Sequence, residues 1–198
     1  MKVHKVFLFL LILVFPFCLT AFGQHSHESK YIGQENRKIK SLSESDIDDL
    51  KNGRGWGLAK AAELNGVPGP IHLLEMKDEI DLSAEQTEKI EILFQTMNSQ
   101  AIPLGLKLID LEKELNSHFA ANTINEDLLK KLLDRIAQVT SKLRYVHLSY
   151  HLKTPDILTS EQMQLYNKLR GYSSEDPCLN IPKGHDPQMW KMHNNCPE

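Results

Sequence analysis

Two long stretches of the chain carry apolar residues that alternate four and three positions apart. The first stretch contains Ile90, Phe94, Met97, Ala101, Leu104, Leu108, Leu111, Leu115 and His118. The second contains Leu129, Leu132, Ile136, Val139, Leu143, Val146 and Tyr150. This spacing places successive apolar side chains on one face of a helix. Only a turn at residues 121–125 separates the stretches, so we expect two long helices packed antiparallel as a hairpin.

Shorter helices are expected on both sides of this hairpin. Gly66 should end a helix that starts near Leu58, and Pro70 suits the first turn of the next one, because its missing N–H is not needed there. A last helix should run from Ser160 to Arg170. No run of β-branched residues with period two follows Gln24. The predicted fold is therefore all-α: an elongated antiparallel helical hairpin with shorter flanking helices, four or five helices in all.

Pro103 lies inside the first long helix and should kink it or open it locally, since proline removes one backbone hydrogen bond and clashes with the preceding turn. The first long helix has more apolar residues than its four-three stripe contains. These extra residues pack in the core or line a face for a partner: Ile92, Leu93, Ile102, Leu106 and Ile109.

The chain begins with the features of a secretion signal. Lys2 and Lys5 precede an apolar run that ends at Leu19, and Ala21-Phe22-Gly23 resembles a cleavage site. The run is too short for a membrane span, so we expect cleavage before Gln24, export to the periplasm and no span in the mature chain. The expected divisions are a signal peptide at 1–23, a flexible segment at 24–42, the hairpin domain at 43–172 and a tail rich in His, Met and Cys at 173–198.

Cleavage would remove two lysines and no acidic residue, which changes the net charge from −3 to −5. An acidic chain of this kind is not expected to bind nucleic acid. Cys178 and Cys196 are the only cysteines after residue 23, and in an oxidising compartment they should form a disulfide. We find no phosphate-binding loop, nucleophile elbow, His-Glu-x-x-His or Cys-x-x-Cys motif, so an enzyme is not expected.

One short pattern occurs twice: Leu82-Ser83-Ala84-Glu85-Gln86 precedes the first long helix, and Leu158-Thr159-Ser160-Glu161-Gln162 precedes the last helix. In each copy a hydroxyl can accept a hydrogen bond from the first turn of the helix, and the Gln three residues later can bond back to the backbone of the capping residue. With the hairpin between them, the two copies resemble the LTxxQ signature of the Spy/CpxP family over roughly residues 45–172. Ala62 to Gly66 with Pro68-Gly69-Pro70 also resembles a subgroup described as periplasmic or heavy-metal-resistance proteins. The first copy departs from the signature in having Ser83 in place of Thr.

The resemblance implies an elongated helical protein, often a homodimer. It also implies one of two activities: chaperones of the family bind unfolded clients on a concave face, and sensors hold divalent metal with His and acidic residues. Partners would be unfolded envelope proteins or the periplasmic domain of a sensor kinase.

Two groups of residues could hold a metal ion in the hairpin domain. His147 and His151 lie four apart beside the helix seam and could share an ion, although Arg144 one turn away opposes a cation. His72 and Glu75 lie on the polar face of a short helix, which is otherwise simply solvated. If that helix packs across the hairpin, the four side chains would suit zinc, nickel, cobalt or copper.

The tail offers an alternative metal site. His185, Met189, Met192 and His193 lie between the two cysteines, and thioethers beside imidazoles favour copper, Cu⁺ above all. The simpler interpretation is a surface loop closed by the disulfide. The preferred hypothesis from the sequence is a periplasmic metal-binding or metal-resistance protein. An ATP-independent holdase and a regulator of an envelope-stress kinase are the alternatives.

Overall fold

The computed structural model describes residues 29–172, 178, 181 and 184–196. It divides into a unit at 1–32, of which only 29–32 are described, and a unit at 33–198 that contains all the described helices. The elements of this second unit are η1 Gln34–Asn36, α1 Glu44–Lys51, α2 Lys60–Glu63, α3 Pro70–Glu75, α4 Ala84–Ala120, α5 Glu126–His151, η2 Pro155–Ile157, α6 Ser160–Leu169 and α7 Pro187–His193. Every element in the described residues is helical, which confirms the all-α prediction. The predicted signal peptide at 1–23 lies outside them.

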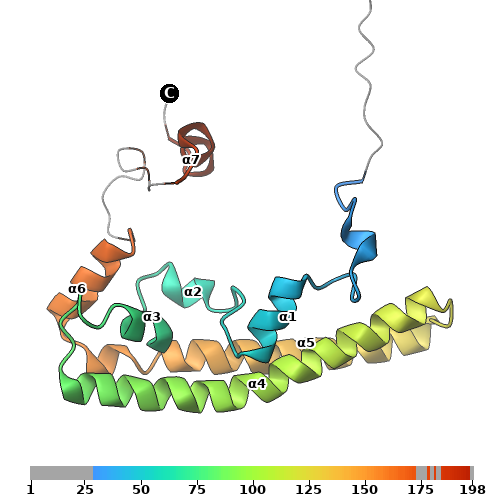
Figure 1. The fold of residues 1–198 in the computed structure, drawn as a ribbon, viewed down its shortest axis with the longest axis horizontal. Helices are drawn as coiled ribbons and strands as arrows, with labels where there is room; N and C mark the ends of the chain where they lie inside the picture. Colours follow the sequence, from blue (N-terminus) through green and yellow to red (C-terminus); the bar gives the residue numbers. More distant parts are fainter. Residues whose placement is uncertain (1–28, 173–177, 179–180, 182–183, 197–198) are drawn as a thin grey trace, which may run out of the picture. The chain divides into compact units, whose positions relative to one another are not determined.

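Helices α4 and α5 form the predicted antiparallel hairpin (Figure 1). Their facing stripes contribute to one core, which the segment before α1 and α1 itself complete; its buried members are Ile39, Leu42, Leu50, Met97, Ala101, Leu108, Leu143, Val146 and Tyr150. The 37 residues of α4 and the 26 of α5 give the hairpin unequal arms. Helix α5 stops at His151, earlier than Thr154-Pro155, and the short turn η2 follows.

Helix α4 continues through Pro103 as one helix, from Ala84 to Ala120. Pro103 is exposed, and so is Ser99, whose carbonyl loses its usual partner. Water can solvate that carbonyl, so the helix tolerates the proline there.

Helix α1 lies directly on α4 at Gly105. A Cβ added to Gly105 would overlap the carbonyl oxygen of Leu50, the buried residue of α1. The absence of a side chain at this position therefore permits the close approach of the two helices.

Order begins earlier than the sequence suggested. Ile39 and Leu42 belong to the hydrophobic core, and the Lys40 amide donates to Asn116 Oδ1 of α4 at 3.2 Å. The expectation that residues 24–42 are loosely attached is therefore wrong for 39–42, since these residues bury apolar surface against the hairpin. Residues 24–28 lie outside the described part.

A second core lies where α3 and α6 meet the start of α4. Leu73, Ile80, Ile90 and Tyr166 are fully buried there. Both predicted caps are present: Ser83 and Thr159 each accept a hydrogen bond from the backbone three residues on and complete a capping box with Gln86 and Gln162.

The Cys178–Cys196 disulfide is formed, as predicted. Helix α7 lies between the two cysteines, where the sequence suggested only a loop. Asp186 caps it by accepting from the Met189 amide at 2.8 Å, and Pro187 occupies its first turn. None of the described helices is both long enough and apolar enough to cross a bilayer.

Candidate functional site

A cavity of about 590 Å³ lies over the face of the hairpin where α5 ends. Its wall is made by the loop after α1, by α2 and α3, and by side chains of α4 and α5. Its lining includes Asp49, Arg54, Trp56, Glu63, Gly69, His72, Glu75, Phe94, Met97, Asn98, His147 and His151. The volume is within the roughly 300–1,000 Å³ of small-ligand sites.

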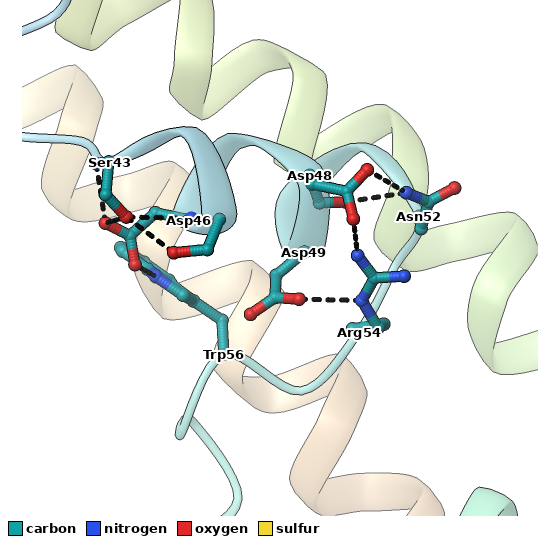
Figure 2. Close-up of polar contacts among 8 residues, drawn as sticks. Ser43, Asp46, Asp48, Asp49, Asn52, Arg54 and Trp56 are labelled. Carbon is teal, nitrogen blue, oxygen red and sulfur yellow. Dashed lines mark hydrogen bonds and ion pairs between the residues drawn. The ribbon is translucent and has the colours of Figure 1, made fainter. Parts of the chain in front are cut away.

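The loop after α1 is held in place by a network of acidic side chains, shown in Figure 2. The Arg54 guanidinium donates to Asp49 Oδ1 at 2.6 Å and also to Asp48. The Trp56 indole N–H donates to Asp46 Oδ1 at 2.8 Å. These bonds turn the loop back over the hairpin, so that Trp56 becomes part of the cavity wall.

The pair His147 and His151 is buried at the base of the cavity, more deeply than its expected place beside the seam. His147 is 3% exposed and His151 is 6% exposed. His151 Nδ1 lies 2.7 Å from the Val67 carbonyl oxygen. A carbonyl only accepts, so Nδ1 donates its proton, which leaves Nε2 as the ring nitrogen that can offer a lone pair.

Glycine at position 69 leaves space for His151. A Cβ on Gly69 would lie only 2.7 Å from His151 Nε2. Any larger residue there would crowd the nitrogen that has the free lone pair. Thr154 holds the backbone next to Gly69 in place, because its hydroxyl donates to the Pro68 carbonyl at 2.6 Å.

His147 has a buried ring nitrogen, Nε2, with no hydrogen-bond partner in the protein. Burial, and secondarily the neighbouring His151, lowers the pKa of His147 to about 4. The ring is therefore neutral at pH 7. A buried polar atom without a partner is uncommon and indicates a missing water, ion or ligand.

His72 and Glu75 stand at the outer rim. Their side chains are bonded to each other, with His72 Nδ1 and Glu75 Oε2 2.9 Å apart, and Glu75 is 58% exposed. The packing of α3 across the hairpin thus brings all four predicted residues into one cavity wall. In the described part of the chain, however, no three His, Cys, Asp or Glu side chains converge as a ready metal site.

Glu63 also lines the cavity, and sequence reasoning missed it. Its Oε1 accepts from Tyr166 at 2.6 Å and forms an ion pair with Arg170 at 3.0 Å, and Tyr172 lies 3.4 Å away. Burial, together with the bond to Glu63, raises the pKa of Tyr166, so its phenol stays protonated and donates. Helix α6 and the residues just after it therefore position this carboxylate.

Asn98 is a second wall residue that the sequence did not suggest. Its Oδ1 is buried without a partner, and it lies under Gly53 of the loop. Neither residue belongs to a motif. Each lies against a segment far away along the chain, Glu63 against Tyr166 and Asn98 under Gly53.

The tail residues form a separate group on α7 and the turn before it. His185 stacks edge-on against Trp190, with ring centroids 4.8 Å apart. Met189 and Met192 are 51% and 66% exposed. His193 Nδ1 lies 2.8 Å from the Met189 carbonyl oxygen.

Comparison with known proteins gives no family. No family model matches the chain, and neither a curated protein nor a solved structure is similar to it. The function must therefore be argued from the cavity and its side chains.

Proposed function

We propose that this is an exported protein that binds a divalent transition metal ion in the cavity through His147 and His151. The observation that carries the proposal is the unpartnered Nε2 of His147, which is buried in a wall shared with His151. Its pKa of about 4 favours this role, because a metal ligand must be a neutral imidazole and protons hardly compete at pH 7.

The two rings supply nitrogen from one helix face, at the i and i+4 spacing that suits a shared ion. Hydrogen bonding of His151 Nδ1 to the Val67 carbonyl orients the ring and fixes the tautomer that leaves Nε2 free. Imidazole nitrogen favours zinc, nickel, cobalt or Cu²⁺ over calcium or magnesium.

The remaining ligands would come from water or from the rim. His72 and Glu75 are bonded to each other and partly exposed, so rotation of either side chain could bring a third donor toward an ion. Because the cavity is much larger than an ion, water also has room to complete the coordination.

The test is calorimetric titration of the exported chain with Zn²⁺, Ni²⁺, Co²⁺ and Cu²⁺ in turn. One ion should bind one chain, and the His147→Ala, His151→Ala double variant should lose that binding. His118→Ala is the matched control, since its ring bonds Thr123 at the other end of the hairpin. Absence of any binding tighter than about millimolar, roughly −4 kcal/mol, would eliminate the proposal.

Gly69→Ala offers a second test that keeps both imidazoles. The backbone at 69 is extended, with φ −86°, so alanine fits the backbone while its methyl group crowds His151 Nε2. Metal affinity should fall while helix content stays constant. Unchanged affinity would show that His151 Nε2 is not a ligand.

A second candidate function is supported by exposed apolar side chains on the hairpin. Ile92, Leu106, Phe119, Leu133 and Tyr145 are each at least 45% exposed. Of the surplus residues, Leu93 and Ile109 instead pack against the core. An exposed apolar surface favours a partner, which could be an unfolded envelope protein, a sensor kinase domain or a second copy in a homodimer.

Suppression of aggregation of a reduced client at stoichiometric ratios would support a holdase. Sedimentation of the chain alone would report a dimer. The disulfide favours an oxidising compartment, and the periplasm is the location that we propose.

A further inference from the structure

Helix α7 carries thioether and imidazole side chains that differ in chemistry from the side chains of the cavity. Met189, Met192 and His193 lie three and four positions apart, so their side chains emerge from one face of the helix. Lys191 projects from the opposite side, since two residues turn a helix by about 200°. The shared face therefore presents two thioethers and one imidazole without an adjacent ammonium group.

A hydrogen bond of the His193 ring leaves one of its nitrogens available to bind a metal. Its Nδ1 lies 2.8 Å from the Met189 carbonyl oxygen, which only accepts, so Nδ1 carries the proton. Nε2 is then the atom with the free lone pair. It is held in orientation by the same bond, as metal-ligating histidines usually are.

The two methionines are exposed although their side chains are apolar. Met189 is 51% exposed and Met192 is 66% exposed. Methionine has three rotatable bonds and a polarisable sulfur, so both sulfurs can reach an ion that the neighbouring imidazole holds. Met192 and His193 also lie in the last turn, where the partial negative charge of the helix end favours a cation.

The disulfide makes this short helix a stable platform. A seven-residue helix is too short to persist alone in water. The Cys178–Cys196 bond closes the segment that contains it, and the Cys196 amide donates to the Lys191 carbonyl at 3.0 Å. The cysteine sulfurs are bonded to each other in the disulfide, so the soft ligands would be the thioether sulfurs of methionine.

We propose that Met189, Met192 and His193 form a site for monovalent copper. Two thioethers and one imidazole suit Cu⁺, whereas Zn²⁺ and Ni²⁺ prefer imidazole, thiolate and oxygen. His185 of the same segment is not part of the site, because its ring stacks on Trp190.

The test is an anaerobic competition titration of the exported chain with Cu⁺ against bathocuproine disulfonate. Ascorbate keeps the copper reduced and leaves the disulfide intact. The chain should take one Cu⁺, and Met189→Leu, Met192→Leu and His193→Ala should each weaken it by more than the roughly 10- to 100-fold typical of outer-shell changes.

Two matched controls make the result specific. Met163→Leu replaces a thioether on α6, and His185→Ala removes an imidazole from the same segment; neither should change Cu⁺ affinity. The methionine variants should also leave Zn²⁺ binding by the cavity unchanged, so failure of this site is distinguishable from failure of the proposed function. Failure of the parent chain to compete for Cu⁺, or parent-like affinity in the Met189→Leu, Met192→Leu double variant, would overturn the assignment.

Discussion

The side-chain amides of Gln86 and Gln162 exchange hydrogen bonds between the starts of α4 and α6. Gln86 Nε2 donates to Gln162 Oε1 at 2.8 Å, and Gln162 Nε2 donates to Gln86 Oε1 at 3.0 Å. Each amide also donates to a backbone carbonyl, Gln86 to that of Ile157 and Gln162 to that of Asp81. The two copies of the repeated sequence pattern therefore meet in the folded chain and join two helix caps into one network.

Replacement of either glutamine should destabilise the domain. Gln86→Ala removes both bonds to the Gln162 amide and leaves the Ile157 carbonyl and the Ser83 amide without their side-chain partner, which costs about 1–3 kcal/mol in the free energy of unfolding. The Gln86→Ala, Gln162→Ala double variant should lose less than the sum of the single losses. Urea denaturation of the parent chain, the two single variants and the double variant measures the coupling between the amides, with exposed Gln164→Ala as the control. Strictly additive losses would show that the two amides are not coupled.

Gly105→Ala should also destabilise the domain, although alanine is the better helix former by about 1 kcal/mol. The added methyl group would overlap the Leu50 carbonyl and push α1 away from α4. Overpacking of this kind costs about 1–3 kcal/mol. Thermal unfolding would detect the loss. Gly55→Ala, where nothing lies within 4 Å of the new Cβ, should be nearly neutral, and a more stable Gly105→Ala protein would contradict the packing described here.

His147 should make the domain sensitive to acid. Its pKa is about 4 in the folded chain and about 6.5 when unfolded, so the unfolded state binds the proton more readily. The contribution of neutral His147 to the free energy of unfolding is complete above pH 6.5 and is lost as the pH falls toward 4. The shift corresponds to about 3 kcal/mol.

Urea denaturation at pH 4, 5, 6 and 7 would measure this dependence. His147→Leu should flatten the curve in that window, whereas His118→Leu should retain it. If the leucine variant at position 147 loses stability on acidification as steeply as the parent chain, then burial of this ring is not the cause.

Reduction of the disulfide should loosen α7 and leave the hairpin intact. The closed segment spans 18 positions, and the chain-entropy model assigns about 3 kcal/mol to a loop of this size. Amide hydrogen exchange in 187–193 should accelerate in the Cys178→Ser, Cys196→Ser variant, while exchange in α4 and α5 stays slow. Equal acceleration in the hairpin would mean that the tail supports the domain.

The sequence alone predicted the hairpin because a buried stripe leaves a local signature. The four-three spacing located the residues that α4 and α5 contribute to the main core, and the Ser83 and Thr159 caps located two helix starts. Helix α7 was not predicted although Asp186-Pro187 is a recognisable start, because a helix of 7 residues is too short to show an apolar period. Ile39 and Leu42 were missed because their burial depends on contacts with the distant hairpin.

The candidate site was predictable only in its local parts. The spacing of His147 and His151 marked them as a pair, but their burial depends on distant segments, since His151 lies against Val67 and Gly69 before α3. The loop held by Arg54 and Trp56 lines the same cavity. Nothing in the sequence near Glu63 marks it as a site residue. Its partners Tyr166 and Arg170 lie about a hundred residues further along the chain.

The cavity wall is assembled from four separate stretches of chain, so its occupant would act as a cross-link between them. By mass action, an ion present at 100 times its dissociation constant adds about 2.7 kcal/mol to the folded state. When digestion proceeds through the unfolded chain, its rate follows the unfolded population, so the metal-loaded chain would persist about a hundredfold longer in the presence of protease. In the cell, abundance of this protein would then rise with metal supply even at a constant rate of synthesis.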